Sequence, residues 1–217
     1  MKVGTDGVLL GAWASPPISE GGLYLDVGTG TGLIALMLAQ RFLMAKIEGI
    51  DIDDASIKQA KENVKESVFC QQIEVRKQDF LNLDSFSRKY DLIVSNPPFY
   101  VEDTLGGKEA RDIARHSTFL PFEKLVSNAA FLLKEGGHFS VIIPHKSASE
   151  LISLCAQNGL YLTRRMDIRS TEKKPFKRTL LEFSTSIQST VTSILTLYDQ
   201  QQNRTYEYAE LTSEFYL

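Results

Sequence analysis

The sequence predicts an α/β fold in which a mainly parallel sheet carries helices on both faces and ends in an antiparallel edge. Short apolar runs alternate with helical patterns from Leu23 onward, which is typical of βαβ units. A glycine-rich turn joins the first apolar run to the first helical pattern. Beyond Leu160 the apolar runs follow one another without helices, as in antiparallel strands. The chain of 217 residues fits one domain, 1–217.

The spacing of apolar residues and the positions of glycines indicate the first helices and strands. The run Leu23–Val27 is apolar and closed by glycines, so it reads as a strand, and Leu33–Arg41 has the length and composition of a helix. Lys46–Asp51 is expected to be the second strand. In the next helix, Ala55–Glu66, apolar residues share one face and lysines the other.

The second half repeats this alternation before it changes character. Further strands are expected at Ile73–Arg76, Tyr90–Ser95 and His138–Ile143. Helices are expected at Phe122–Leu133 and Ser147–Gln157, stopped by the pairs Gly136–Gly137 and Asn158–Gly159. The edge comprises the predicted strands Leu160–Ile168, Leu180–Thr185 and Val191–Tyr198.

Composition excludes several classes of protein. A formal net charge of −3 argues against a surface coated uniformly in positive charge, although a local basic patch is compatible with it. Cys70 and Cys155 lie far apart, and the histidines His116, His138 and His145 are scattered, so we expect no metal. No signal peptide or membrane-spanning segment is present, which predicts a cytoplasmic protein without a membrane partner.

The turn Asp26–Gly32 has the wrong spacing for a dinucleotide. A dinucleotide fingerprint places its third glycine three positions after the second, and that position is Leu33. A carboxylate at Asp26 would repel a pyrophosphate but suits an ammonium or sulfonium group, and S-adenosylmethionine carries both. Gly28 and Gly30 let the backbone approach such a ligand. The alternative is a tight turn that serves only helix packing.

Acids at the ends of the next two strands support a nucleoside site. Asp51 lies about 20 residues beyond the turn, where a ribose diol needs an acceptor, and Ile52 can lie against an adenine face. Asp79 is placed to accept from the adenine amino group, with Phe80 as an apolar wall. Together these residues predict that S-adenosylmethionine is the cofactor.

The tetrad Asn96-Pro97-Pro98-Phe99 follows the fourth predicted strand. Two prolines fix the backbone and remove two N–H donors, so nearby carbonyls can point into a pocket. The Asn96 side-chain oxygen and the Pro97 carbonyl can accept the two hydrogens of an exocyclic amine and localise its lone pair, while Phe99 stacks on the base. The alternative is a Pro-Pro turn beside a buried Phe.

The two motifs in combination resemble the class I S-adenosylmethionine-dependent amino-methyltransferases. The opening Met1–Trp13, the pair Arg115-His116 and the closing Phe215–Leu217 narrow the resemblance to the bacterial tRNA(Val) adenine-37 N6-methyltransferase family. Members of that family usually carry a further strand or hairpin before the segment that here begins at Met1. The likeness covers nearly the whole chain.

The resemblance implies a Rossmann-like class I methyltransferase fold with a seven-stranded, mainly parallel sheet and an antiparallel last strand. It also implies a monomer that methylates the N6 amine of adenine-37 in tRNA, with residues 1–22 covering the cofactor and residues 160–217 forming the edge and C-terminal segment. By the same resemblance we expect Thr5 to lie in the cofactor pocket; the alternative is that Thr5 caps a helix. His116 faces the RNA, or else caps the next helix.

Two stretches could hold RNA on an acidic protein. The run Glu172–Arg178 carries four positive charges between two predicted strands: Lys173, Lys174, Lys177 and Arg178. Phe176 among them offers a stacking surface for an unpaired base. Arg111 and Arg115 lie in the long segment after the tetrad. The alternative is a solvated hairpin turn that keeps the sheet edge soluble.

Two other functions fit the same motifs. A protein-glutamine N5-methyltransferase uses the same tetrad because an amide nitrogen poses the same lone-pair problem, although it normally needs a separate partner-docking domain. A regulator that binds the methyl donor without catalysis is the alternative from another class. An intact tetrad favours an enzyme over that regulator.

Overall fold

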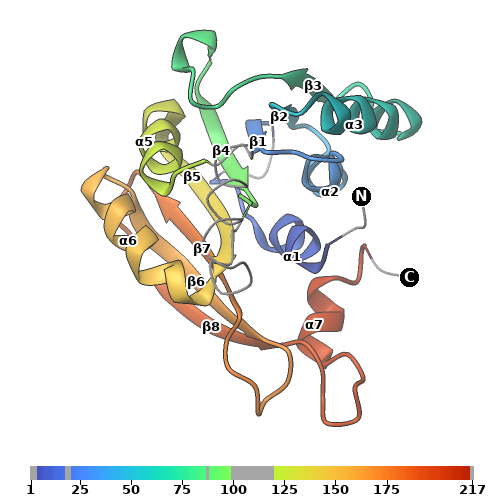
Figure 1. Ribbon diagram of the computed structural model, residues 1–217, viewed down its shortest axis with the longest axis vertical. Helices are drawn as coiled ribbons and strands as arrows, with labels where there is room; N and C mark the ends of the chain where they lie inside the picture. Colours follow the sequence, from blue (N-terminus) through green and yellow to red (C-terminus); the bar gives the residue numbers. More distant parts are fainter. Residues whose placement is uncertain (1–3, 18–20, 87, 99–119, 216–217) are drawn as a thin grey trace, which may run out of the picture.

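The computed structural model describes residues 4–17, 21–86, 88–98 and 120–215. One sheet of eight strands has the order β3-β2-β1-β4-β5-β7-β6-β8, and Figure 1 shows it running through the middle of the molecule. Its strands are β1 (Leu23–Val27), β2 (Lys46–Asp51), β3 (Ile73–Lys77), β4 (Tyr90–Ser95), β5 (Leu133–Pro144), β6 (Tyr161–Arg169), β7 (Arg178–Ser184) and β8 (Val191–Thr196). The helices are α1 (Thr5–Trp13), α2 (Leu33–Arg41), α3 (Asp54–Glu66), α5 (Phe122–Leu132), α6 (Ala148–Gln157) and α7 (Tyr206–Leu211).

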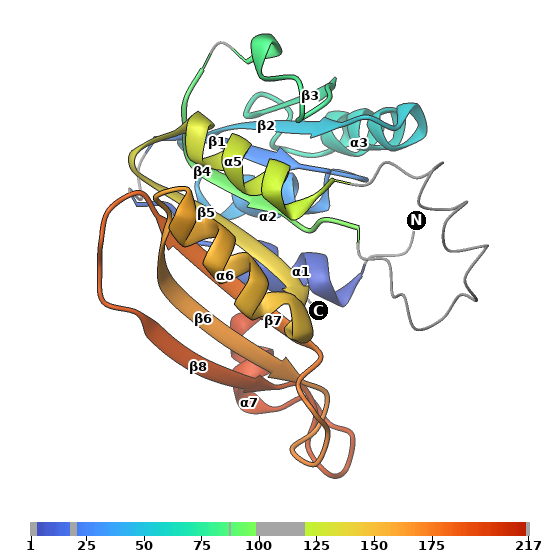
Figure 2. The ribbon, with the colours of Figure 1, turned by 60° about the vertical axis from the view of Figure 1, so that its left-hand side comes forward.

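Helices cover both faces of the sheet, and each face has its own core. One core packs α1, α2, α3 and α7 against the sheet, and the other packs α5 and α6, which lie on opposite sides in Figures 1 and 2. Strand β4 serves both, because Leu92 and Val94 face the first core and Ile93 faces the second. Alternate residues of a strand point to opposite faces, so a strand covered on both sides is apolar throughout.

The predicted α/β class is confirmed, with a different edge. The sheet has eight strands rather than seven, and β7 alone runs antiparallel to its neighbours β5 and β6. The outermost strand β8 pairs in parallel with β6. Because the chain reverses direction after β7, β8 runs antiparallel to β7. However, β8 pairs with β6 on the outer side of the sheet and not with β7. The expected antiparallel seventh strand is therefore confirmed, and β8, which the sequence predicts within the antiparallel edge, is an eighth strand that pairs in parallel.

Most predicted elements agree with the structure to within a few residues. Asn158 is the C-cap of α6 and Gly159 has a positive φ of 74°, as expected of a helix stop. Gly136 and Gly137 are different: α5 ends at Leu132, and the pair lies within β5, where its register against β4 shifts. These glycines belong to a bulge in the strand, a feature that glycine also favours.

Helices α1 and α7 have no counterpart among the predicted elements. In α1, residues Gly7 to Trp13 are all buried, so no polar face marks an amphipathic period. Helix α7 has only six residues. In the described ranges no helix is long and apolar enough to cross a membrane. The same ranges contain no group of three or more His, Cys, Asp or Glu side chains arranged to hold a metal ion.

Candidate functional site

A cavity of about 650 Å³ opens at the carboxyl edge of the parallel strands. Its walls come from the turns that follow β1, β2, β3 and β4, together with the start of α1. In an open α/β sheet this crevice is the usual place for a ligand, and the volume falls within the range of small-molecule pockets. Most of the residues that the sequence predicted for a cofactor line this cavity.

The glycine turn after β1 forms one wall of this cavity. Gly28, Gly30 and Gly32 all have positive φ, at 72°, 57° and 81°. A side chain at these positions would be strained, and glycine adopts such angles without cost. The backbone N–H groups of Gly28 and Thr29 donate to the carbonyl oxygen of Ile50, both at 2.9 Å. These bonds bind the turn to the end of β2, so the two ligand-facing turns form one rigid unit.

Asp26 lies beneath the turn and is fully buried. Its Oδ2 accepts from Thr29 Oγ1 at 2.6 Å and from the Ala35 N–H at 3.2 Å, whereas Oδ1 is buried without a hydrogen-bond partner in the described structure. Burial raises the pKa of Asp26 to about 7, with a small contribution from Asp51, although the bonds from Thr29 and Ala35 oppose the rise. Unlike Val27 and Gly28, Asp26 does not itself line the cavity.

Asp51 and Ile52 line the cavity at the end of β2, as predicted. Asp51 is fixed by two backbone donors: Oδ2 accepts from the Gly30 N–H and Oδ1 from the Asp53 N–H, both at 3.0 Å. A carboxylate held on both oxygens keeps one orientation, and its remaining lone pairs can accept from a ligand. The geometry is suitable for the two hydroxyls of a ribose.

Asp79 and Phe80 line the cavity after β3. The Leu81 N–H donates to Asp79 Oδ1 at 2.8 Å, which fixes the turn. Phe80 is buried, and its carbonyl accepts from the Asn128 side chain of α5 at 2.8 Å. An apolar ring beside an exposed carboxylate fits a flat base with an exocyclic amine.

Asn96, Pro97 and Pro98 line the same cavity and lie beside the glycine turn. Strands β1 and β4 are parallel neighbours with Val27 opposite Ser95, and Ser95 Oγ donates to the Val27 carbonyl at 3.0 Å. This pairing places the ends of both motifs together, although 68 positions separate Val27 from Ser95. Phe99, the last residue of the tetrad, lies outside the described residues.

The start of α1 forms a further wall through Gly4 and Gly7. Thr5 between them is exposed and does not line the cavity. It is the first residue of α1, whose N-cap is Gly4, so Thr5 does not cap the helix either. A Cβ at Gly7 would lie 3.1 Å from Leu33 Cδ2, and glycine therefore permits close packing of α1 on α2.

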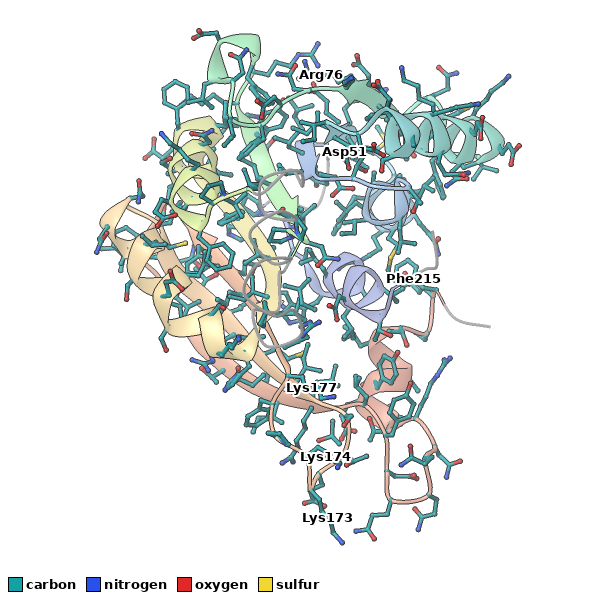
Figure 3. The ribbon with its side chains drawn as sticks, in the orientation of Figure 1. Asp51, Arg76, Lys173, Lys174, Lys177 and Phe215 are labelled. Carbon is teal, nitrogen blue, oxygen red and sulfur yellow. The ribbon has the colours of Figure 1, made fainter. Side chains whose placement is uncertain are left out.

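The basic loop, residues 172–178, lies between β6 and β7. It is at the same end of the strands as the opening of the cavity. Lys173, Lys174 and Lys177 are exposed, and Figure 3 shows them toward the opposite end of the molecule from Asp51. Arg178 is an exception, because its Nε donates to Asp6 Oδ2 of α1 at 2.7 Å.

Phe176 is partly buried rather than open for stacking. Its ring lies 5.2 Å from the His145 ring, and the Arg169 guanidinium lies 5.6 Å from its centroid. Arg111, Arg115 and His116, the other predicted RNA contacts, lie outside the described residues.

Sequence reasoning missed several cavity residues. Gly4 and Gly7 belong to a segment without a predicted element, and Gln78 precedes the predicted Asp79. Ser56 and Leu120 reach the cavity from α3 and from the segment before α5. A polar residue next to an expected contact could have indicated Gln78, but nothing local marks Leu120, because its place depends on how distant segments pack.

Comparisons with known proteins agree with this geometry. Residues 8–158 match the family model described as methyltransferase small domain. The chain is 44% identical over 218 residues to the tRNA1(Val) (adenine(37)-N6)-methyltransferase of Bacteroides thetaiotaomicron, covering 100% of this chain and 91% of that protein. It is 42% identical over 227 residues to the protein of the same name from Flavobacterium psychrophilum, covering 100% and 93%.

A solved structure shares the fold at low sequence identity. The crystal structure of a predicted O-methyltransferase from Agrobacterium tumefaciens superposes with a TM-score of 0.76, covers 96% of each chain and is 16% identical in sequence. The arrangement of sheet and helices is thus shared with that structure.

Proposed function

Because the chain belongs to the methyltransferase small domain family and, within it, to the tRNA1(Val) (adenine(37)-N6)-methyltransferases, we propose that it methylates the N6 amine of adenine-37 in tRNA1(Val). One observation carries the proposal. The glycine turn and Asn96-Pro97-Pro98 line a single cavity, joined by the bond from Ser95 to Val27. A methyl donor and an exocyclic amine held by these two motifs would therefore meet.

The family and fold imply S-adenosylmethionine as the methyl donor, and the residues present fit it. Asp51 would accept from the ribose hydroxyls, and Asp79, Ile52 and Phe80 would enclose the adenine. The unpartnered Oδ1 of Asp26 is a buried acceptor under the turn, and the carboxylate would favour a cationic amino acid group of the ligand in the adjoining cavity, which Val27 and Gly28 line. The position of Gly4 and Gly7 in the cavity wall supports a cofactor-covering role for residues 1–22 within a single domain, 1–217.

When bound, S-adenosylmethionine supplies a methyl group on a positively charged sulfur. The protein contributes the geometry of the acceptor. The lone pair of an aromatic amine is shared with its ring, and hydrogen bonds from the amine to the Asn96 oxygen and the Pro97 carbonyl favour the pyramidal form in which this pair is localised. Phe99 would stack on the adenine and hold its plane. The acceptors at these positions are neutral oxygens that orient the amine, and the proton that the methylated amine must lose would pass to solvent.

We assign Lys173, Lys174 and Lys177 to the phosphate backbone of the tRNA. They are exposed cations on a loop at the same sheet edge as the cavity, and phosphate contacts need only charge and reach. Arg111 and Arg115 follow the tetrad in sequence and belong to the same proposal. Arg178 contributes differently, since its ion pair with Asp6 joins the loop to α1.

Methyl transfer from radiolabelled S-adenosylmethionine tests the function. Purified protein is incubated with total tRNA and, separately, with total cellular protein, and labelled tRNA is digested and analysed for N6-methyladenosine by mass spectrometry. We expect label in valine tRNA at adenine-37. Label in the protein fraction would indicate a glutamine methyltransferase, and cofactor binding without transfer to either would indicate a regulator.

A further inference from the structure

His145 is the centre of a polar cluster that the cofactor cavity does not include. Its Nδ1 lies 2.9 Å from Thr179 Oγ1 and 3.2 Å from Asp167 Oδ1. Thr179 is fully buried and Asp167 is 9% exposed, whereas 32% of the His145 side chain is exposed. Arg165 also contacts Asp167, with Nε and Nη2 each 3.0 Å from Oδ2. The cluster thus fixes one nitrogen of the ring, Phe176 packs beside the ring with 5.2 Å between ring centroids, and about a third of the side chain stays exposed.

The hydrogen bonds determine which ring nitrogen carries the proton. Thr179 Oγ1 donates its only hydrogen to Asp167 Oδ1 at 2.7 Å, so it can only accept from His145. Asp167 is an acceptor as well, held by the Arg165 guanidinium. Nδ1 therefore carries a hydrogen and donates, and when the ring holds only this one hydrogen, Nε2 is a hydrogen-bond acceptor. Within the described part of the chain, Nε2 has no hydrogen-bond partner.

The position of His145 suggests what Nε2 would accept. His145 directly follows β5, and β5 is the parallel neighbour of β4, which leads into Asn96. It therefore lies at the end of the strands where the cavity opens, on the strand next to the one that leads into the tetrad. Its backbone N–H donates to the carbonyl of Lys177 in the basic loop at 3.1 Å. A strand of RNA that reaches from Asn96 to the lysines of that loop would pass His145.

We propose that His145 Nε2 accepts a hydrogen bond from a ribose 2′-hydroxyl of the tRNA anticodon arm, and this rests on the proposed function. A ribose hydroxyl is a donor that occurs at every nucleotide of RNA and is absent from DNA. Phosphate offers no hydrogen to a neutral imidazole. Asp167 and Thr179 are positioning residues, since they set the tautomer that makes Nε2 an acceptor.

A scan of single 2′-deoxy substitutions tests this. A synthetic anticodon stem-loop of valine tRNA, with each loop ribose replaced in turn, is titrated against the wild-type protein and against His145→Ala. In the wild type, one substitution weakens binding about 3- to 10-fold, as expected for one neutral hydrogen bond. The His145→Ala variant loses a similar factor with unmodified RNA and nothing further at that position.

Lys146→Ala is the matched control, because it removes the neighbouring exposed side chain and leaves His145 in place. It should weaken binding of all the RNAs to a similar extent and keep the 2′-deoxy effect. Should His145→Ala fail to bind cofactor and thus be misfolded, Thr179→Val, which removes both bonds of the hydroxyl, should reduce the same 2′-deoxy effect.

Three results would overturn the proposal. They are a wild type that is insensitive to every 2′-deoxy substitution, an equal 2′-deoxy penalty in wild type and His145→Ala, and a lower salt slope in the variant, which would indicate a phosphate contact. Failure of the proposed function looks different, because the wild type would then neither methylate tRNA nor bind the stem-loop.

Discussion

At the scale of single residues, stability and binding make opposite demands on Asp26. A buried carboxyl with an unpartnered oxygen destabilises the folded protein whenever it is ionised. The charge of the same carboxylate would favour a cationic ligand group in the adjoining cavity, although Asp26 does not itself line it. Residues of this kind are frequent in functional sites, because the strain that they introduce is relieved by the ligand.

The substitution Asp26→Asn should therefore stabilise the protein without ligand and weaken cofactor binding. The pKa of Asp26 is raised from 3.8 to about 7 by burial, so the unfolded state releases its proton first. Wild-type stability should fall as pH rises from about 4 to 7 and then level off. At pH 8 the variant should gain about 1–3 kcal/mol in urea unfolding.

At pH 4 this advantage should disappear, because the carboxyl is then neutral in the folded state. Calorimetric titration at pH 8 should show at least a 10-fold loss of affinity for S-adenosylmethionine. Equal stability of the two proteins at pH 8, together with equal affinity, would show that Asp26 stays neutral and has no contact with the ligand charge.

We expect Asn96 to act on the amine that accepts the methyl group and to contribute little to the affinity for S-adenosylmethionine. We expect Asn96→Ala to lower kcat for tRNA by about 10²- to 10³-fold, as when one preorganised acceptor of a transition state is removed. Single-turnover kinetics would measure this, with cofactor affinity by calorimetry as the control. Methylation at the wild-type rate would remove Asn96 from the mechanism.

At the scale of elements, different loops at the carboxyl ends of the strands line the cavity and carry the exposed cations. The turns after β1 to β4 line the cavity, and the loop between β6 and β7 carries the exposed lysines. Arg178 lies at the junction, since its ion pair with Asp6 joins β7 to α1, the helix whose start lines the cavity. The cavity and the exposed lysines therefore lie at the same end of the strands but over different parts of the sheet (Figure 3).

Replacing Lys173, Lys174 and Lys177 together by Gln should weaken tRNA binding and flatten its salt dependence. Each lost phosphate contact reduces the slope of log K against log salt by about 0.7–0.9. Filter binding between 50 and 200 mM salt would measure it, and cofactor affinity should not change. Wild-type affinity and slope in this variant would place the RNA on another surface.

Arg178→Gln is the contrasting variant for this loop. Its guanidinium is paired with Asp6 in a partly exposed bridge, so the loss should lower stability by less than about 1 kcal/mol. We expect a smaller change of the salt slope than any of the three lysines produces, because this charge is already neutralised within the protein.

At the scale of the whole molecule, the cavity is lined by segments from residues 4 to 120, including Gly4 and Gly7 at the start of the N-terminal helix. Helix α1 is fixed to the rest of the fold by Arg41, whose Nη1 donates to the carbonyls of Gly11 and Ala14, and by the packing of Phe215 against its buried face. Figure 3 shows Phe215 beside α1, far from the lysines of the basic loop. A ligand in the cavity would therefore stabilise elements at both ends of the chain.

Cofactor binding should raise the melting temperature of the whole chain in one transition. Ligand at 100 times its Kd adds about 2.7 kcal/mol to the free energy of unfolding, which corresponds to about 5–10 °C for a protein of this size. Scanning calorimetry would measure the shift, and Asp51→Ala is the control that should show a smaller one. Two transitions, of which only one moves, would mean that the cavity is not coupled to the edge strands.

The sequence by itself determined the local features of this protein. The glycine turn, the acids Asp51 and Asp79 at strand ends, and the Asn96-Pro97 motif were all recognisable, because each depends on residues that lie close together in the chain and on the period of one element. For the same reason the boundaries of β1, α2, β2 and β4 were predicted to the residue.

Only the tertiary structure decided what depends on distant partners. The place of β8 beside β6, the helical form of α1, the burial of Asp26, the pairing of Arg178 with Asp6 and the tautomer of His145 have no local signature. A short helix that is buried all round has no amphipathic period, and strand order is set by which surfaces pack best. Orientation of a polar side chain follows from the partners that packing brings within hydrogen-bond distance, and such partners can lie anywhere in the sequence.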